Sequence, residues 1–321
     1  MPWVLGLDGG GSRTVALIAN EKGRVLGRGE SGPATQHTAG LARAAEAIRS
    51  ATYQALDDAG LMVQALHAAC FALVGADHTI DRQVMASVIA SLGLKCPITL
   101  EHDATAALAG ATGGRPGAII IADTGAMAYG EDATGQRARA DGYGPIVGDT
   151  GSGYDVGRKA LMAALRHEDG RGPATLLTER ITRRFMLGSM TDILNLVHGN
   201  PAPLQRQDIA AIAPKVIQCA QEGDRVALDL VRTAGQELGA AVSAVLARLS
   251  WPTEEPIPVA GLGSMFEAGP LLVDPMQQVI HANEPRAMLV KPQHTPSYGA
   301  VLLALRSLNI QLDETPEERH A

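Results

Sequence analysis

Both halves of the chain open with the same short pattern: an apolar strand, an aspartate, a turn of small residues and a returning strand. In the first half the pattern spans Leu5–Gly11 with Asp8 at its centre, and in the second it spans Ile120–Ala126 with Asp123 at its centre. Repetition of this kind predicts two related domains with similar folds. The length of 321 residues is sufficient for two domains.

Three short apolar or β-branched segments joined by tight turns predict an antiparallel meander at the N-terminus, because no crossover helix fits between them. These segments are Val4–Leu7, Thr14–Asn20 and Val25–Gly29. Apolar spacing typical of helices then alternates with short strands, which indicates an α/β fold. The long later helices are predicted over Gly157–His167, Ala174–Met186, Ile209–Gln221 and Asp224–Leu249.

The glycine- and proline-rich segment Thr112–Gly117 is typical of a break between domains. We therefore predict one domain over residues 1–115 and a second, with helical insertions, over residues 116–321. The final helix, from about 297 to 308, is a candidate to pack back on the first domain. The charged tail Asp313–Ala321 is expected to be disordered.

Charge and composition exclude several classes of partner. The formal net charge of −7 argues against nucleic acid or an anionic membrane. No stretch approaches the ~20 consecutive apolar residues of a membrane span, and the N-terminus lacks the features of a signal peptide. The three cysteines lie far apart with no metal-ligand spacing. These features predict a reduced, cytoplasmic protein.

The first aspartate-led turn has the composition of a phosphate site. Its glycines leave backbone N–H groups open to a polyphosphate, and Asp8 offers a hard oxygen ligand for Mg²⁺. Hydroxyl and guanidinium donors follow the glycines. A plain hairpin turn explains the same residues equally well. The candidate nucleotide-binding residues are Gly9, Gly10, Gly11, Ser12, Arg13 and Thr14.

The second aspartate-led turn is the candidate for a second phosphate clamp. Thr124 offers a hydroxyl and Gly125 an exposed amide, and a plain turn is the alternative. The familiar alternatives fail: no GxxxxGK[ST] loop occurs in the chain, and Gly151–Gly157 has the wrong spacing for a dinucleotide-binding turn.

Asp103 stands where a strand runs into a helix, and two interpretations are open. It fits the N-cap of that helix. It also fits a carboxylate that accepts the proton of a substrate hydroxyl during phosphoryl transfer, where positioning matters more than base strength. The neighbouring His102 is expected to be a packed or surface residue.

Asp141–Gly153 contains five glycines in thirteen residues, which indicates a backbone wrapped closely around a ligand. Asp149 could accept hydrogen bonds from sugar hydroxyls, and the ring of Tyr143 could pack against a pyranose face. A flexible surface loop is the alternative.

These motifs together resemble the N-acetylglucosamine kinase-like family, the BadF/BadG/BcrA/BcrD-type ATPase branch of the actin, hexokinase and heat-shock chaperone superfamily. The strongest pieces are Leu7–Thr14 and Gly142–Tyr154, and Gly261–Phe266 looks like an adenosine-contacting turn. The resemblance covers nearly the whole chain. It implies two ribonuclease H-like domains around a central cleft, usually in a homodimer.

The resemblance also implies roles for single residues. Asp8 organises Mg²⁺, Gly10–Thr14 and Thr124 hold the phosphates of ATP, and Asp103 is the base. The adenosine site is lined by Gly261, Gly263 and Ser264. The sugar is contacted by Gly142, Tyr143, Gly144 and Asp149, together with the segment that contains Thr35, Gln36 and His37.

Three departures from the family pattern affect specificity more than kinase activity. Many members have Gly-Thr-Gly-Ser at the second clamp, where this chain begins with Asp123. The sugar loop has Thr150 after Asp149 where a glutamate is common, and Pro33–Thr38 replaces an asparagine-rich segment. An aspartate at the second clamp is tolerable if it helps to hold Mg²⁺.

The sequence thus predicts a kinase that transfers a phosphoryl group from ATP, with Mg²⁺, to an amino sugar such as N-acetylglucosamine or glucosamine, at the 6-hydroxyl by analogy. Two alternatives stay open: an ATPase activator of a 2-hydroxyacyl-CoA dehydratase, which requires cysteine ligands for an iron–sulfur cluster, and a non-catalytic sugar sensor on the same fold.

Overall fold

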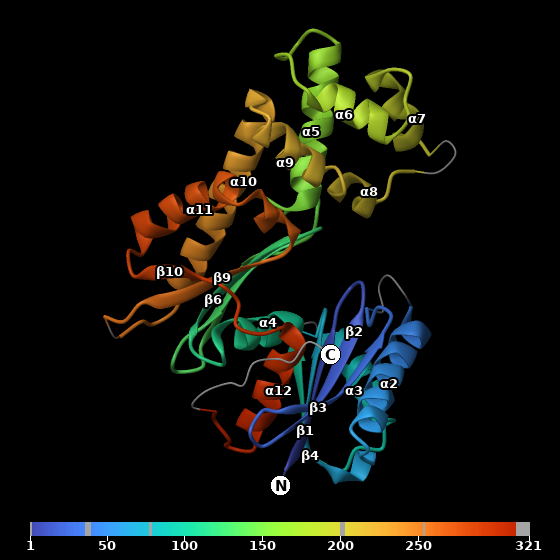
Figure 1. Cartoon of the computed structure of the whole chain (residues 1–321), viewed down its shortest axis with the longest axis vertical. Coiled ribbons are helices and arrows are strands. Elements are labelled where there is room, and N and C mark those ends of the chain that lie inside the picture. The colour runs from blue at the N-terminus through green and yellow to red at the C-terminus, as the bar shows by residue number, and fades with distance from the viewer. Residues whose placement is uncertain (1, 36–39, 77–78, 200–202, 253, 313–321) are drawn as a thin grey trace. The chain divides into compact units, whose positions relative to one another are not determined.

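The computed structural model describes residues 2–35, 40–76, 79–199, 203–252 and 254–312 (Figure 1). The chain divides into two compact units. The first holds the residues up to Pro116 and those from Lys291 onward, and the second holds Gly117–Val290. The chain therefore passes from the first unit to the second within the predicted breaker segment, between Pro116 and Gly117, and it returns to the first unit before its last helix.

The first unit is built on a five-stranded sheet with the order β3-β2-β1-β4-β5. Its first three strands form the predicted antiparallel meander, and β4 and β5 run parallel to β1. In the parallel part, Gly9, Leu73 and His102 lie in register, so the carboxyl ends of three strands meet at one edge. The strands are β1 (Trp3–Gly9), β2 (Thr14–Asn20), β3 (Val25–Ser31), β4 (Leu66–Leu73) and β5 (Ile98–His102).

Both faces of this sheet are covered by helices. Leu5 and Leu7 point into a buried cluster with α2 (Leu41–Asp58) and α3 (Thr79–Ala90). Because side chains alternate along a strand, Val4 points to the other face, into a cluster with the C-terminal helix. Strands buried on both faces are typical of parallel sheets covered by helices.

The C-terminal helix α12 (Pro296–Ser307) packs beside α4 (Asp103–Thr112) in the first unit (Figure 1). The two helices approach so closely that a Cβ on Gly299 would lie 1.9 Å from the carbonyl oxygen of Ala106. The buried Tyr298 donates its hydroxyl to the carbonyl of Gly23 at 2.9 Å. These contacts hold α4, and hence its first residue, firmly against the sheet.

The second unit repeats the sheet of the first. Its strand order, β8-β7-β6-β9-β10, matches the first sheet strand for strand, with an antiparallel meander followed by two parallel strands. The α/β fold with two related units, predicted from the repeated strand–aspartate–turn pattern, is confirmed. The strands are β6 (Gly117–Ala122), β7 (Ala126–Glu131), β8 (Arg137–Asp141), β9 (Ile257–Leu262) and β10 (Ala287–Val290).

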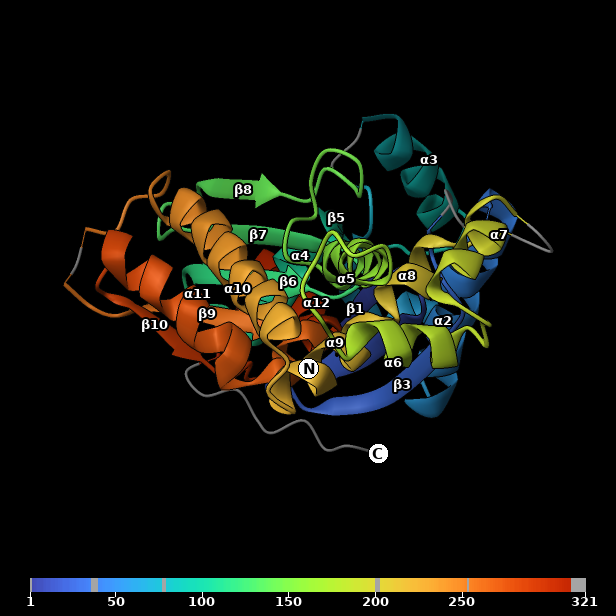
Figure 2. The ribbon, with the colours of Figure 1, turned by 90° about the horizontal axis from the view of Figure 1, so that it is seen from above.

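Most helices of the second unit come between β8 and β9 in the sequence. Figure 2 shows α10 (Arg225–Leu246) crossing one face of the sheet over β6 and β7, with α11 (Pro270–Asn283) beside it. Buried side chains from both helices join Ala118 and Ile120 in one core. The remaining helices are α5 (Gly153–Glu168), α6 (Leu177–Arg184), α7 (Ile193–Val197), α8 (Arg206–Ala210) and α9 (Ala213–Gln221).

Two differences from the sequence-based prediction concern these helices. The single helix predicted over Ile209–Gln221 is broken into α8 and α9, because Pro214 lacks an N–H and is accommodated in the first turn of a new helix. The pair α11 and β10 was not predicted, since Pro275 interrupts the helical pattern of α11. Among the helices that the structure describes, none combines the length and apolar character needed to cross a membrane.

Candidate functional site

The first aspartate-led turn joins β1 to β2. Gly9 pairs with Thr14, and the four residues between them form a turn in which the Gly10 N–H donates to the Arg13 carbonyl at 2.9 Å. The Ala34 N–H donates to the Gly10 carbonyl at 3.1 Å. The segment after β3 therefore lies against the turn and fixes its backbone.

Neither the packing around Gly10 and Gly11 nor their backbone conformation requires glycine at these two positions. A Cβ on Gly11 would meet no described heavy atom within 4 Å, and one on Gly10 would meet only the Arg13 carbonyl oxygen, at 3.4 Å. Neither residue has a positive φ. Gly9 differs, because its Cβ would lie 2.4 Å from the Leu73 side chain. Two glycines, of which Gly11 is exposed and Gly10 is partly buried, are thus required by neither packing nor backbone conformation, which fits a turn kept open for a bound group.

Asp8 lies near the end of β1 and is partly buried. Burial raises the pKa of its carboxyl group to about 7; the negative charge of Asp103 also raises it, and the positive charge of Arg13 opposes the shift. Two carboxyl groups and a guanidinium group therefore influence one another at the carboxyl edge of the first sheet. A cation at this edge would favour the ionised form of Asp8.

Asp103 is the first residue of α4, and its Oδ1 accepts a hydrogen bond from the Ala104 N–H at 3.0 Å. The N-cap is His102, whose Nδ1 lies 3.1 Å from Ala104 N. The alternative in which Asp103 is the N-cap is therefore wrong by one residue. His102 Nδ1 also lies 2.9 Å from Asp103 Oδ1, and the Asp103 side chain is 26% exposed. The carboxylate is thus oriented by its neighbours and still reachable.

The predicted sugar-reading segment after β3 is described only in part. Thr35 is buried, one residue after the Ala34 that bonds to the Gly10 carbonyl. Gln36 and His37, predicted as substrate contacts, lie outside the described residues.

In the second unit, the turn Asp123–Gly125 and the turn Gly261–Ser264 lie side by side. Their strands β6 and β9 are parallel neighbours, with Ile121 opposite Leu262. The Ser264 hydroxyl donates to Asp123 Oδ1 at 2.5 Å. Gly263 has a φ of +106°, and its Cβ would lie 2.4 Å from the Ala122 carbonyl oxygen, so only glycine fits there. The residues predicted for phosphate and adenosine binding in this unit are therefore brought together.

The N-terminus of α5 meets the same turn. The Gly153 N–H donates to the Asp123 carbonyl at 2.7 Å, and the Ser152 side chain caps the helix. Asp123 itself is exposed to solvent. The departure from the family pattern at this position thus places a carboxylate, hydrogen-bonded to Ser264, at the surface of the turn.

The glycine-rich loop is organised by Asp141, a residue that the sequence did not single out. Its carboxylate accepts hydrogen bonds from the N–H groups of Gly142 and Asp149, both at 2.7 Å, and of Thr150, at 2.8 Å. An aspartate directly before a glycine-rich loop is a typical acceptor of the loop's own amides, and this signal could have identified it. The loop therefore has a backbone conformation that is fixed by hydrogen bonds to one carboxylate.

Tyr143 presents its ring at the surface of this loop, with 64% of the residue exposed. The Arg139 guanidinium lies 5.4 Å from the ring centroid and donates to the Gly142 carbonyl at 2.6 Å. Gly142 and Gly144 both have positive φ, as the tight loop requires. An exposed aromatic ring backed by a cation fits the predicted packing against a sugar face.

Asp149 is buried in the base of the loop with a positive φ of 57°. It accepts hydrogen bonds from the Gly144 N–H, at 3.3 Å, and from the Ala126 N–H, and it forms an ion pair with Arg206. Burial raises the pKa of this carboxyl group, and Arg206 opposes the shift. Arg206, the first residue of α8, was not predicted, because nothing in its local sequence links it to a loop 57 residues earlier.

Asp8 and Asp123 were predicted as ligands of Mg²⁺. Within the described ranges, no group of three or more His, Cys, Asp or Glu side chains is placed to hold a metal ion. Mg²⁺ usually takes one or two protein carboxylates, with phosphate oxygens and waters as its other ligands. Asp8 in the first unit and the exposed Asp123 in the second could each supply one such carboxylate.

Comparison with known proteins gives the family. The model of the BadF/BadG/BcrA/BcrD ATPase family matches residues 5–304. The chain belongs to this family. An N-acetylmuramic acid/N-acetylglucosamine kinase of Clostridium acetobutylicum is 31% identical over 304 residues, which cover 95% of this chain and 98% of the relative. An N-acetyl-D-glucosamine kinase of Dictyostelium discoideum is 30% identical, covering 94% and 98%.

The fold agrees with that of a solved structure. The structure of a candidate N-acetylglucosamine kinase from Chromobacterium violaceum matches with a TM-score of 0.73 and 27% identity, covering 95% of this chain and 99% of that one. The predicted two-unit, actin-like ATPase architecture is confirmed. Membership in an ATPase family implies that the chain uses ATP.

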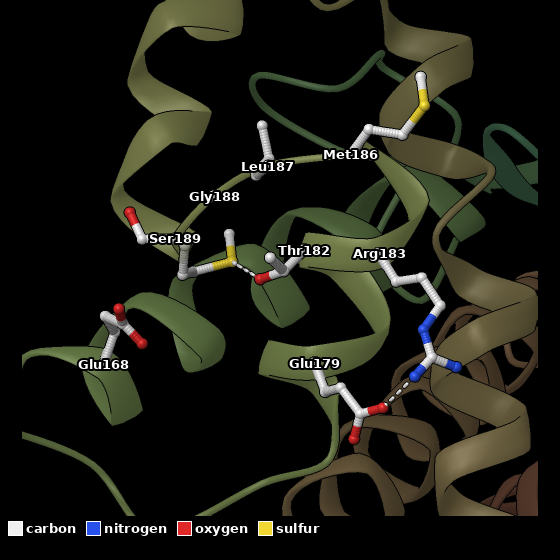
Figure 3. Close-up of a pocket in the computed structure, with 9 residues that line it drawn as sticks. Glu168, Glu179, Thr182, Arg183, Met186, Leu187, Gly188 and Ser189 are labelled. Carbon is white, nitrogen blue, oxygen red and sulfur yellow. Dashed lines mark hydrogen bonds and ion pairs between the residues drawn. The ribbon is translucent and has the colours of Figure 1, made fainter.

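A separate pocket lies in the helical part of this family member's second unit. It has a volume of about 540 Å³ and is formed by the end of α5, by α6 and by the segment that follows α6. Figure 3 shows the ion pair between Glu179 and Arg183 and the contact of Thr182 with a methionine sulfur in its wall. None of the predicted site residues lines this pocket, so it plays no part in the function proposed below.

Proposed function

We propose that the protein transfers the terminal phosphoryl group of ATP to a hydroxyl group of an amino sugar, with N-acetylglucosamine or glucosamine as the substrate and the 6-hydroxyl as the acceptor. The names of the two relatives reported above support an amino sugar as substrate. The observation that carries the proposal is the turn after β1. It holds two glycines that neither packing nor backbone conformation requires, and the interacting carboxyl groups of Asp8 and Asp103 lie at the same edge of the sheet.

In this proposal the glycine turn of the first unit and the turn Asp123–Gly125 of the second hold the phosphates through backbone N–H groups and hydroxyls. Asp8 and Asp123 hold Mg²⁺, which neutralises charge on the phosphate oxygens when bound. Gly261, Gly263 and Ser264 line the adenosine site. Support comes from the adjacency of these turns within the second unit.

Asp103 is the proposed base. Its carboxylate is held by the Ala104 N–H and by His102, and about a quarter of its side chain is exposed. A carboxylate in this state can accept the proton of a sugar hydroxyl as the oxygen attacks phosphorus. A weak base suffices, because positioning and charge stabilisation account for most of the catalysis in phosphoryl transfer.

The sugar contacts are assigned to the glycine-rich loop of the second unit and to Thr35, Gln36 and His37 of the first. Tyr143 offers its exposed ring, and Gly142 and Gly144 bring the backbone close. Asp149 differs from the other candidates, because it already accepts bonds from two N–H groups and from Arg206. A carboxylate offers about four acceptor positions, so a sugar hydroxyl would take the remaining one.

A coupled assay of ADP release tests the proposal. We expect magnesium-dependent turnover with one or more of glucosamine, N-acetylglucosamine, N-acetylmannosamine, N-acetylmuramate and glucose. Asp103→Asn should reduce the sugar-stimulated rate by at least 100-fold and leave nucleotide binding intact, as general-base catalysis contributes about 10²–10⁴-fold. Asp57→Asn on the exposed face of α2 is the matched control. Full activity of Asp103→Asn would refute the assignment of the base.

The 6-hydroxyl is tested with the sugar that gives turnover. The 6-deoxy form of that sugar should give no product, and the phosphate of the product should couple to the C6 protons in its NMR spectrum. Product formed from the 6-deoxy sugar would show that another hydroxyl is the acceptor.

The activator alternative is disfavoured by the cysteines. Cys70 and Cys219 are fully buried in β4 and α9. Ligands of a cluster shared between subunits must reach a surface, which these two side chains do not. A brown, iron-containing purified protein would revive this alternative, and sugar binding without turnover would favour the sensor.

A further inference from the structure

The guanidinium group of Arg206 lies against the second phosphate clamp. A Cβ on Gly125 would lie 2.7 Å from Arg206 Nη2 and 2.9 Å from Asp149 Oδ2. The ion pair therefore occupies the space that any other residue at position 125 would fill. This gives Gly125 a reason to be glycine, and it places a cation beside the clamp.

Arg206 has donors to spare. A guanidinium group carries five N–H donors in a fixed fork. Within the part of the chain that the structure describes, its side chain forms one hydrogen-bonded contact, with Asp149, and 40% of the side chain is exposed. Asp149 is only 5% exposed at its side chain and is held by two backbone N–H groups. The buried carboxylate thus orients the guanidinium group, and the other donors of this group have no partner among the described residues.

The position of Arg206 along the turn indicates which phosphate it meets. The turn Gly261–Ser264, assigned to adenosine, contacts the first residue of the clamp through the bond from Ser264 to Asp123. Arg206 Nη2 lies beside the third residue, Gly125, 2.7 Å from the place where a Cβ of that residue would stand. A nucleotide bound with its adenosine at Ser264 would extend its phosphates along the clamp toward Arg206.

We propose that Arg206 binds the terminal phosphoryl group of the nucleoside triphosphate and that Asp149 is its positioning residue. The inference rests on the proposed nucleotide site. Arginine suits this role because its fork matches phosphate oxygens in a bidentate manner. An arginine supplied by the same chain stabilises the charge of a transferring phosphoryl group in other nucleotide-dependent enzymes.

Nucleotide affinity, measured by calorimetry without sugar, tests the proposal independently of catalysis. Arg206→Ala should weaken the binding of a non-hydrolysable ATP analogue at least tenfold and change ADP affinity less than twofold. Arg206→Lys should lie between Arg206→Ala and the parent, since lysine keeps the charge and loses the fork. Arg183→Ala, which removes an arginine of a surface ion pair on α6, is the matched control.

Two results would overturn the proposal. Equal losses of ATP and ADP affinity would mean that Arg206 serves the shared phosphates or only the structure of the loop. Unchanged affinity for both nucleotides, with a raised KM for sugar alone, would assign it to the acceptor. Thermal unfolding of each variant identifies a loss of folding. Failure of the proposed function would appear differently, as absence of sugar-stimulated turnover in the parent protein.

Discussion

Asp8 and Asp103 interact electrostatically at the carboxyl edge of the first sheet, although Asp8 lies on β1, Asp103 directly follows β5, and β4 lies between these two strands. Burial is the largest cause of the raised pKa of Asp8, about 7 against an ordinary 3.8, and the charge of Asp103 is the second. The folded, metal-free protein therefore holds a proton on Asp8 at pH values where the unfolded chain has lost it.

This difference predicts that stability falls as pH rises. Between the ordinary pKa and the raised one, unfolding releases a proton, so the free energy of unfolding should decrease by about 2 kcal/mol from pH 5.5 to pH 8 through Asp8 alone. Urea unfolding in the presence of a chelator measures it. Asp8→Asn should remove this part of the pH dependence, and an identical slope in the variant would show that Asp8 is not its source.

The open glycines predict a separation between stability and binding. Gly11→Ala should leave the free energy of unfolding within about 0.5 kcal/mol of the parent, because its Cβ would meet no described atom. It should reduce nucleotide affinity at least tenfold, since the methyl group would enter the space kept for phosphate. Calorimetric titration with ADP and ATP measures the effect.

Two other glycines provide controls for that experiment. Gly32→Ala also adds a Cβ to open space and should change neither quantity. Gly9→Ala should instead destabilise the fold by about 1–3 kcal/mol, because its Cβ would press on Leu73 and Ala34. If Gly11→Ala bound nucleotide normally, the turn would be a plain hairpin.

A substitution at Gly125 tests whether the second phosphate clamp and Arg206 act together. In Gly125→Ala the added Cβ would displace the Arg206–Asp149 pair, so the variant should lose affinity for ATP more than for ADP. The double variant with Arg206→Ala should bind ATP no more weakly than the weaker single variant, because residues that share one interaction are not additive. Additive losses in this double-mutant cycle would mean that Gly125 and Arg206 act separately.

The repeated pattern around Asp8 and Asp123 was sufficient to predict the fold and the residues of both turns, because strand alternation and glycine turns are local signals. Contacts made at long range were not accessible in this way. Arg206 reaches Asp149 only after α5–α8 fold, and the packing of α12 on α4 depends on Gly299 meeting Ala106. The prediction of His102 as a packed or surface residue named no partner, and the structure adds that this side chain caps α4 and contacts Asp103.

Asp141 offers the sharpest test of whether the glycine-rich loop is pre-formed for the sugar. Asp141→Ala would leave three N–H groups without their acceptor and would place alanine at a φ of 62°. We expect a loss of about 1–3 kcal/mol in stability and a rise of at least tenfold in the KM for sugar, with the KM for ATP changing less. Asp141→Asn keeps one oxygen acceptor and tolerates the left-handed conformation, so its effects should be smaller.

Hydrogen exchange at Gly142, Asp149 and Thr150 should accelerate in the alanine variant. Unchanged exchange together with an unchanged sugar KM would mean that the loop keeps its shape without the carboxylate.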